Sequence, residues 1–307
     1  MRARGMCLLA SMLVLAGCED FDIGGFTQRY KEDFHFSYPL AEGGRIELEN
    51  FNGSVEISGW DQNTVDIDGT KYASTENRLR EMKIDVRPSA GSVMIRTVPP
   101  IDRHGNAGAR YIVRVPRHAE LANIVTSNGP IRVTDMDGAA HLRTSNGGVR
   151  LSDIHGLVDA RTSNGGVELD NVVGDATLHT TNGSIHADVK KGRFEATTSN
   201  GSITARLMEP DQSPVRLESS NGHIDLTMDA PREVHASTSN SSITVHMPPA
   251  VGATVHAHTT NASISSDFDV SVHGGRLSRH QMDGTIGAGG PLLDLSTSNG
   301  AIRLTRL

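Results

Sequence analysis

The chain has 307 residues, and its 29 Lys and Arg against 36 Asp and Glu give a formal net charge of −7 at pH 7. Aromatic residues make up only 4% of the chain. An acidic chain with so few aromatic side chains lacks the basic, stacking surface of nucleic-acid binders, so we predict no nucleic-acid partner. Cysteine occurs only at Cys7 and Cys18, which excludes a disulfide framework as the source of stability.

The chain begins with an export signal, predicted over residues 1–17. Arg2 and Arg4 precede an apolar stretch that is too short to span a membrane. The sequence Leu15-Ala-Gly-Cys18 resembles the lipobox of bacterial lipoproteins. That resemblance implies cleavage after Gly17 and diacylglycerol on Cys18, which would hold the protein on a membrane. An ordinary signal peptide or a cytosolic start is the alternative. Loss of both arginines leaves 27 basic against 36 acidic residues, a net charge of −9.

Residues 18–28 are predicted to form a short lipidated tether, because Gly24 and Gly25 make it flexible. Residues 29–118 follow as an N-terminal β capping region. Their runs of alternating apolar residues predict strands, and Asn52 lies in a motif that predicts a first coil. Trp60 falls at an apolar position of that coil, so we expect it in the core. A cap is needed because the open end of a solenoid exposes unpaired strand groups.

Residues 119–307 repeat the phrase Thr-Ser-Asn-Gly at nearly constant spacing. The first four steps between successive Asn residues are 18 residues long, and the next three are 19–21 residues long. The last gap, from Asn261 to Asn299, is about two steps, and Asp283 stands inside it where another turn is expected. Repetition at a short fixed period is typical of a solenoid, in which each coil packs only on its neighbours.

Each repeat predicts two short strands on either side of the Asn-Gly turn. Apolar residues stand six and four positions before the Asn, and polar residues alternate with them. The residue three positions after the Asn is always β-branched and apolar: Ile131, Val149, Val167, Ile185, Ile203, Ile224, Ile243, Ile264 and Ile302. The fold class is therefore all-β, a single-stranded parallel β-helix of about 18–21 residues per coil with an irregular N-terminal β cap.

The same alternation places the Asn side chains inside the coil. Stacked at about 4.8 Å, identical amides can bond one another as a ladder. We interpret this ladder as scaffold, not as a ligand-binding or catalytic site: Asn128, Asn146, Asn164, Asn182, Asn200, Asn221, Asn240, Asn261 and Asn299.

Three features resemble the bacterial "putative adhesin" family, which is often found on lipoproteins. They are the Glu49–Trp60 opening, the Val-Arg-Val-Pro element at residues 113–116 and the Thr-Ser-Asn-Gly series. The resemblance covers residues 40–307 and implies a right-handed parallel β-helix. Ser241 and Ala262 in place of Gly, and Asp283 in place of Asn, depart from the motif and indicate local irregularity.

Two pairs of basic residues are expected to be neighbours from coil to coil: Arg132 with Arg150, and Arg143 with Arg161. Together they would form an anion-binding patch able to meet a phosphate or a uronate. The alternative is a solvated edge, since Glu168 and Asp170 lie one coil away.

Other candidate chemistry is sparse. His235, His256 and His258 fall close enough in the repeat for a weak transition-metal site, although scattered surface histidines are the preferred interpretation. Paired acids such as Glu168 with Asp170 are the basis of a polysaccharide-active enzyme as an alternative. No coil has a dense acidic cluster, so we predict no catalytic residue, no metal and no cofactor.

These features predict a non-enzymatic cell-envelope lipoprotein, an adhesin or binding scaffold that presents a rigid β-solenoid surface to a glycan or an envelope protein. An accessory role in envelope maintenance or signalling is the alternative, and a polysaccharide-active enzyme is less favoured. The resemblance to bacterial lipoproteins implies export with lipid anchoring in the outer membrane, since Glu19 follows Cys18 in place of the Asp associated with inner-membrane retention in enteric lipoproteins. The leaflet and the oligomeric state stay open.

Overall fold

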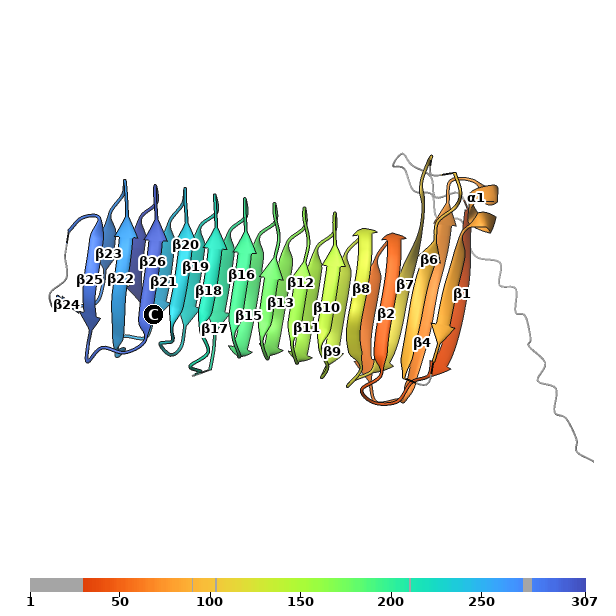
Figure 1. The fold of residues 1–307 in the computed structure, drawn as a ribbon, viewed down its shortest axis with the longest axis horizontal. Coiled ribbons are helices and arrows are strands. Elements are labelled where there is room, and N and C mark those ends of the chain that lie inside the picture. Colours follow the sequence, from red (N-terminus) through yellow and green to blue (C-terminus); the bar gives the residue numbers. More distant parts are fainter. Residues whose placement is uncertain (1–29, 90, 103, 210, 273–277) are drawn as a thin grey trace, which may run out of the picture.

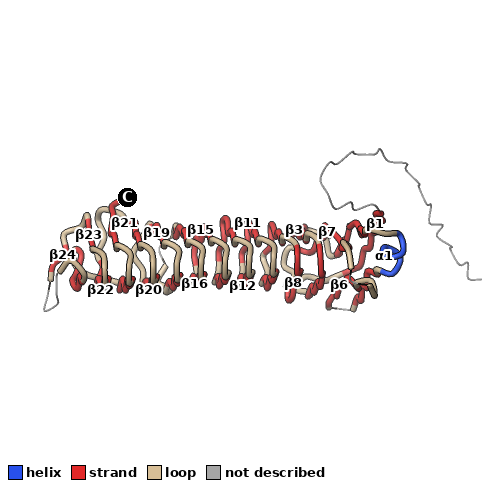
Figure 2. The backbone as a smooth tube through the Cα atoms, turned by 90° about the horizontal axis from the view of Figure 1, so that it is seen from above, coloured by secondary structure: helices blue, strands red, loops and turns tan. Residues whose placement is uncertain are grey.

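The computed structural model describes residues 30–307 except 90, 103, 210 and 273–277. The predicted signal (1–17), Cys18 and the tether (18–28) lie outside the described residues. The described chain forms a straight rod of stacked strands, with a short helix, α1 (Glu76–Glu81), at its N-terminal end (Figure 1). The strands belong to two sheets that face each other along the whole rod (Figure 2).

Sheet A has thirteen strands, and its order along the rod is β1 (Tyr30–Pro39), β4 (Thr64–Ala73), β7 (Ala107–Pro116), β3 (Val55–Trp60), β9 (Ile131–Met136), β11 (Val149–His155), β13 (Val167–Val173), β15 (Ile185–Lys191), β17 (Ile203–Leu207), β19 (Ile224–Met228), β21 (Ile243–Met247), β27 (Ile302–Arg306) and β23 (Ile264–Ser266).

Sheet B has fourteen strands, and from the opposite end its order is β24 (Val270–Ser271), β25 (Gln281–Ile286), β22 (Ala253–Thr259), β26 (Leu292–Thr297), β20 (Val234–Thr238), β18 (Val215–Ser219), β16 (Phe194–Thr198), β14 (Ala176–His179), β12 (Val158–Arg161), β10 (Ala140–Thr144), β8 (Glu120–Asn128), β2 (Arg45–Asn52), β6 (Ser92–Val98) and β5 (Lys83–Pro88).

One strand of sheet B, the turn after it and the next strand of sheet A make one coil, which we call a rung. The parallel strands form eleven rungs, from β6–β7 to β22–β23. Apolar side chains alternate inward along each strand and form one continuous core between the sheets. Residue sizes compensate in this narrow core: Phe194 is fully buried in the same rung as Ala196 and Ala205. The all-β solenoid predicted from the repeat is confirmed, and its right-handed sense stays a prediction.

The turns let successive rungs approach closely. A Cβ on Gly147 would lie 1.9 Å from the carbonyl oxygen of Gly129 in the neighbouring rung. Only glycine fits such a contact without a shift of the backbone. This approach explains the Gly after most of the repeated Asn residues.

Antiparallel strands extend both sheets at the N-terminal end of the rod and sheet B at the C-terminal end. At the N-terminal end β4 pairs with β7, β1 with β4 and β5 with β6. At the other end β25 pairs with β22 and β24 with β25. The predicted first coil at Asn52 is confirmed as the β2–β3 rung, in which Asn52 pairs with Asn128. The β6–β7 rung, outside β2–β3, was not predicted from the sequence.

Two expectations from the sequence are wrong. Asp283 does not mark a further coil, because it lies in β25 and pairs with His256 in antiparallel sense. Trp60 is half-buried at the outer face instead of in the core: its indole Nε1 donates to the carbonyl oxygen of Thr64 at 2.9 Å, and the Arg114 guanidinium lies over its ring at 4.9 Å. The chain turns after Trp60 and continues into β4, which lies beyond β7 in sheet A, so the repeat pattern no longer applies.

Candidate functional site

The Asn side chains form the predicted ladder, but on the outside of the rod. All nine are exposed. Asn146 Nδ2 donates to Asn128 Oδ1 at 2.6 Å, and Asn164 Nδ2 donates to Asn146 Oδ1 at 2.7 Å. The same bond links every following Asn to its neighbour along the edge. The inward placement predicted from the alternation is therefore wrong, because the chain turns before it reaches the Asn.

The buried polar ladder at this edge consists of hydroxyl groups two positions before each Asn. Thr180 is fully buried, and its Oγ1 donates to the carbonyl oxygen of Gly165 at 2.8 Å. The same Oγ1 accepts from the backbone N–H of Gly183 at 3.2 Å. One hydroxyl thus satisfies two backbone groups, which is what a buried turn requires. The equivalent residues are all buried: Thr126, Thr144, Thr162, Thr198, Ser219, Thr238, Thr259 and Thr297.

The four arginines do not form one patch. Arg132 pairs with Arg150 in sheet A, and Arg143 pairs with Arg161 in sheet B, so both neighbour relations are as predicted. All four are exposed on outward faces, and the two sheets face opposite sides of the rod. A single site for one anion is therefore excluded in this arrangement.

Acidic partners also neutralise three of these arginines. Arg132 contacts Glu56 at 3.0 Å, and Arg150 Nε donates to Glu168 at 2.9 Å. Arg161 Nε donates to Asp159 at 2.9 Å, and this bond is the main reason that the pKa of Arg161 is raised. The alternative of a solvated edge with paired charges thus describes three of the four arginines.

A shallow hollow lies on sheet A beside the Asn-Gly edge. It has a volume of about 330 Å³ and crosses four rungs, from Pro130 to His186. Its floor is formed where Gly148, Gly166 and Ser184 follow the turn, since these residues carry little or no side chain. Arg132 and Arg150 line the same hollow. The small residues that open it were not recognised from the sequence, although their repetition directly after the Asn-Gly turn is a visible signal.

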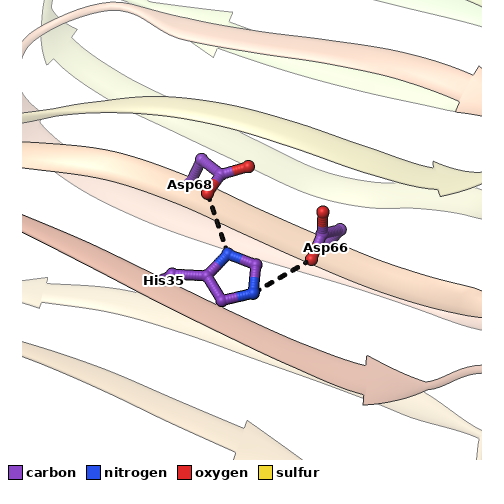
Figure 3. A group of neighbouring side chains, drawn as sticks. All are labelled: His35, Asp66 and Asp68. Carbon is purple, nitrogen blue, oxygen red and sulfur yellow. Dashed lines mark hydrogen bonds and ion pairs between the residues drawn. The ribbon is translucent and has the colours of Figure 1, made fainter. Parts of the chain in front are cut away.

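A second group of polar residues joins the N-terminal strands β1 and β4 on the outer face of sheet A (Figure 3). His35 Nδ1 lies 2.8 Å from Asp68 Oδ1, and His35 Nε2 lies 3.5 Å from Asp66 Oδ1. Asp66 is mostly buried, with 11% of its side chain exposed, whereas His35 is 59% exposed. The sequence pattern does not reveal this group, because its members meet through an antiparallel pairing 33 residues apart.

One imidazole and two carboxylates are a donor set that suits zinc or manganese. In this arrangement, however, Arg114 of β7 also contacts both carboxylates, Asp66 directly and Asp68 at 3.6 Å. Its fixed positive charge opposes a cation at the same place. The group is therefore an ion-pair network that holds β1, β4 and β7 together, and the absence of a metal site stays a prediction.

The histidines near the C-terminal end are not direct neighbours. His235 and His256 both align with Asp294, because β26 lies between β20 and β22. His235 Nε2 lies 2.9 Å from Glu233 and Nδ1 lies 3.3 Å from Asp294. These two carboxylates, Glu233 first, raise the pKa of His235 above its ordinary value. A metal site shared by His235 and His256 alone is therefore not supported.

No helix in the described part of the chain is long and apolar enough to cross a membrane. The observations so far define a class of protein: a two-sided β-solenoid whose exposed rows of side chains are set by a short repeat.

Comparison with known families identifies the family to which the chain belongs. Residues 44–247 match the family model described as Toastrack DUF4097, and the chain belongs to this family. No protein with a curated description matches the chain.

Three solved structures resemble the chain at low identity. A "putative cell adhesion protein" from Clostridium sporogenes is 11% identical, with a TM-score of 0.24 over 90% of this chain and 100% of that one. A "putative lipid binding protein" from Parabacteroides distasonis is 12% identical, with a TM-score of 0.39 over 89% and 96%. A "putative adhesin" from Bacteroides fragilis is 13% identical, with a TM-score of 0.27 over 89% and 97%. TM-scores this low establish no shared fold, so the family assignment rests on residues 44–247.

Proposed function

We propose that the protein is a non-enzymatic envelope lipoprotein that binds an extended acidic glycan along sheet A. The observation that supports this proposal is the hollow that crosses four rungs beside the Asn-Gly edge, with Arg132 and Arg150 along it. A groove that repeats at the rung spacing suits a polymer with repeating units, because each rung can offer an equivalent contact. Both arginines are exposed, so a uronate carboxylate can reach them and exchange with their present acidic partners.

The rod itself supports a scaffold role. Its core is continuous and every internal rung packs on two neighbours, so the outward rows are held in fixed register. Such a surface needs little reordering on binding, which lowers the entropic cost of association.

The test compares two matched double substitutions. R132S/R150S removes the arginines of the hollow, and R143S/R161S removes the equivalent pair on sheet B. With polygalacturonate as the probe, binding should fall at least tenfold for R132S/R150S and stay near the parent value for R143S/R161S. Equal effects of the two variants, or no binding by the parent protein, would exclude this hollow as the site.

The proposed anchor is tested separately. The parent chain should incorporate labelled palmitate and sediment with outer-membrane vesicles, whereas Cys18→Ser should do neither. Recovery of the parent chain without lipid, or with the inner membrane, would reject this part of the proposal.

A further inference from the structure

The order of rungs at the C-terminal end departs from the order of the chain. The last rung, β26–β27, lies between the rungs β20–β21 and β22–β23, which precede it in sequence (Figure 1). In sheet B, β26 pairs with β20 on one side and with β22 on the other. In sheet A, β27 is enclosed by β21 and β23 in the same way. The chain thus passes beyond this position, forms β22 to β25, and then returns to fill it.

The two rungs that enclose the last one match each other in register. Val234 and Val255 both align with Leu293, and Thr238 and Thr259 both align with Thr297. If β26–β27 were absent, equivalent residues of the two enclosing rungs would therefore meet. The Asn ladder shows the same equivalence, since Asn299 donates to Asn240 at 2.8 Å and accepts from Asn261 at 2.8 Å.

Chain length also permits direct contact of the enclosing rungs. Residues 248–252 connect β21 to β22, and residues 229–233 connect β19 to β20. Both connections have five residues, yet β18–β19 and β20–β21 are adjacent whereas β20–β21 and β22–β23 are one rung apart. The connection that spans two steps is therefore no longer than one that spans a single step.

The last rung is joined to the rest by a glycine-rich segment. Residues 287–291 have the sequence Gly-Ala-Gly-Gly-Pro, and Gly287 and Gly289 have positive φ angles of 58° and 79°. This segment crosses the 248–252 connection closely: a Cβ on Gly252 would lie 2.4 Å from the carbonyl oxygen of Gly289. Glycines in these conformations make a hinge from which a terminal rung can leave and return.

A released rung would not be stable alone in water. Its inward residues Leu293, Leu295, Ile302 and Leu304 are at most 1% exposed in place, and their apolar surface favours any position that buries it again. A second copy of the chain offers the same position with the same pattern of partners. Exchange of a terminal element between identical chains is a low-cost route to a dimer.

We propose that the space between the β20–β21 and β22–β23 rungs is a strand-exchange site, which takes the C-terminal rung of its own chain or of a second copy. Reciprocal exchange joins two rods at their C-terminal ends, which lie opposite to the ends formed by β1. The partner is thus defined by its sequence pattern: two strands with alternating apolar residues around a Thr-Ser-Asn-Gly turn.

The test uses two copies of the full chain in which Cys7 and Cys18 are replaced by Ser. One copy carries Ser237→Cys in β20 and the other carries Ser296→Cys in β26, two residues that align as direct neighbours. Neighbouring Cα atoms about 4.8 Å apart are within the range of a disulfide. After the copies are refolded together and oxidised, a disulfide-linked dimer should form. A matched mixture of Thr197→Cys and Glu218→Cys copies, which align in the uninterrupted stack, should give none. No dimer from the first mixture, or equal amounts from both, would overturn the proposal.

Discussion

At the residue scale, the edge of the rod separates two roles that the sequence pattern does not separate. Thr and Asn stand two residues apart, so simple alternation assigns both to the interior. The structure buries only the hydroxyl, which satisfies one carbonyl and one N–H of the turn. A carboxamide has more donors and acceptors than this narrow site can satisfy, and at the exposed edge water completes its bonds. Stability should therefore depend on the Thr more than on the Asn.

Substitutions at Thr180, Thr181 and Asn182 test this difference. Thr180→Val leaves the Gly165 carbonyl and the Gly183 N–H without their partner and should lower the free energy of unfolding by about 1–3 kcal/mol. Thr181 is exposed, so Thr181→Val should change it by no more than about 0.5 kcal/mol. Asn182→Ala should cost about 1 kcal/mol, since it removes exposed bonds. Urea unfolding measures all three free energies. An Asn182→Ala variant less stable than Thr180→Val would contradict the greater importance of the buried hydroxyl.

His235 provides a pH-dependent test at the same scale. Glu233 and then Asp294 raise its folded-state pKa above the ordinary value of 6.5. The resulting stabilisation is fully present below the unfolded pKa and is lost as pH rises through the folded pKa. Glu233→Gln should lower the His235 midpoint in an NMR titration, and it should reduce stability more at pH 6 than at pH 8.5. Glu218→Gln, on the neighbouring strand, serves as the control. An unchanged midpoint in Glu233→Gln would show that this carboxylate does not act on the imidazole.

At the element scale, longer connections between rungs need their own support. Arg232 is 1% exposed; its Nη2 donates to the carbonyl oxygen of Glu209 at 2.6 Å and its Nη1 to that of Gly192 at 3.5 Å. Burial lowers the pKa of Arg232, and the nearby Asp211 raises it. Asp211 also accepts from the backbone N–H of Gly192 at 2.7 Å. One buried side chain therefore ties the lengthened connection around Asp211 to the rungs on either side.

Removal of this side chain should be costly. Arg232→Ala leaves buried carbonyl groups unpaired and should lower the free energy of unfolding by about 3 kcal/mol. Arg216→Ala removes an exposed arginine paired with Glu218 and should cost less than about 1 kcal/mol. Denaturation in urea distinguishes the two, and equal losses would mean that Arg232 has no special role in holding the connection.

At the scale of the whole molecule, the repeat predicts local stacking well and long-range order poorly. Rungs from Asn128 to Asn240 stack in the order of the sequence. The insertion of β26–β27 could not be predicted, since every rung presents the same pattern and the pattern does not distinguish one neighbour from another. The same holds for His35 with Asp66 and Asp68, which meet only through the antiparallel cap. The hollow on sheet A, by contrast, repeats with the period and was open to prediction.

The rod is a stack of rungs in fixed register, and its last rung in sequence is inserted one place before the end. Distance measurement between spin labels at Asp159 in β12 and His256 in β22 tests it most directly. Six strand steps separate these positions in sheet B, so the labels should be about 29 Å apart with a narrow distribution. A distance near 24 Å would mean five steps and no inserted rung, and a broad distribution would contradict the rod itself.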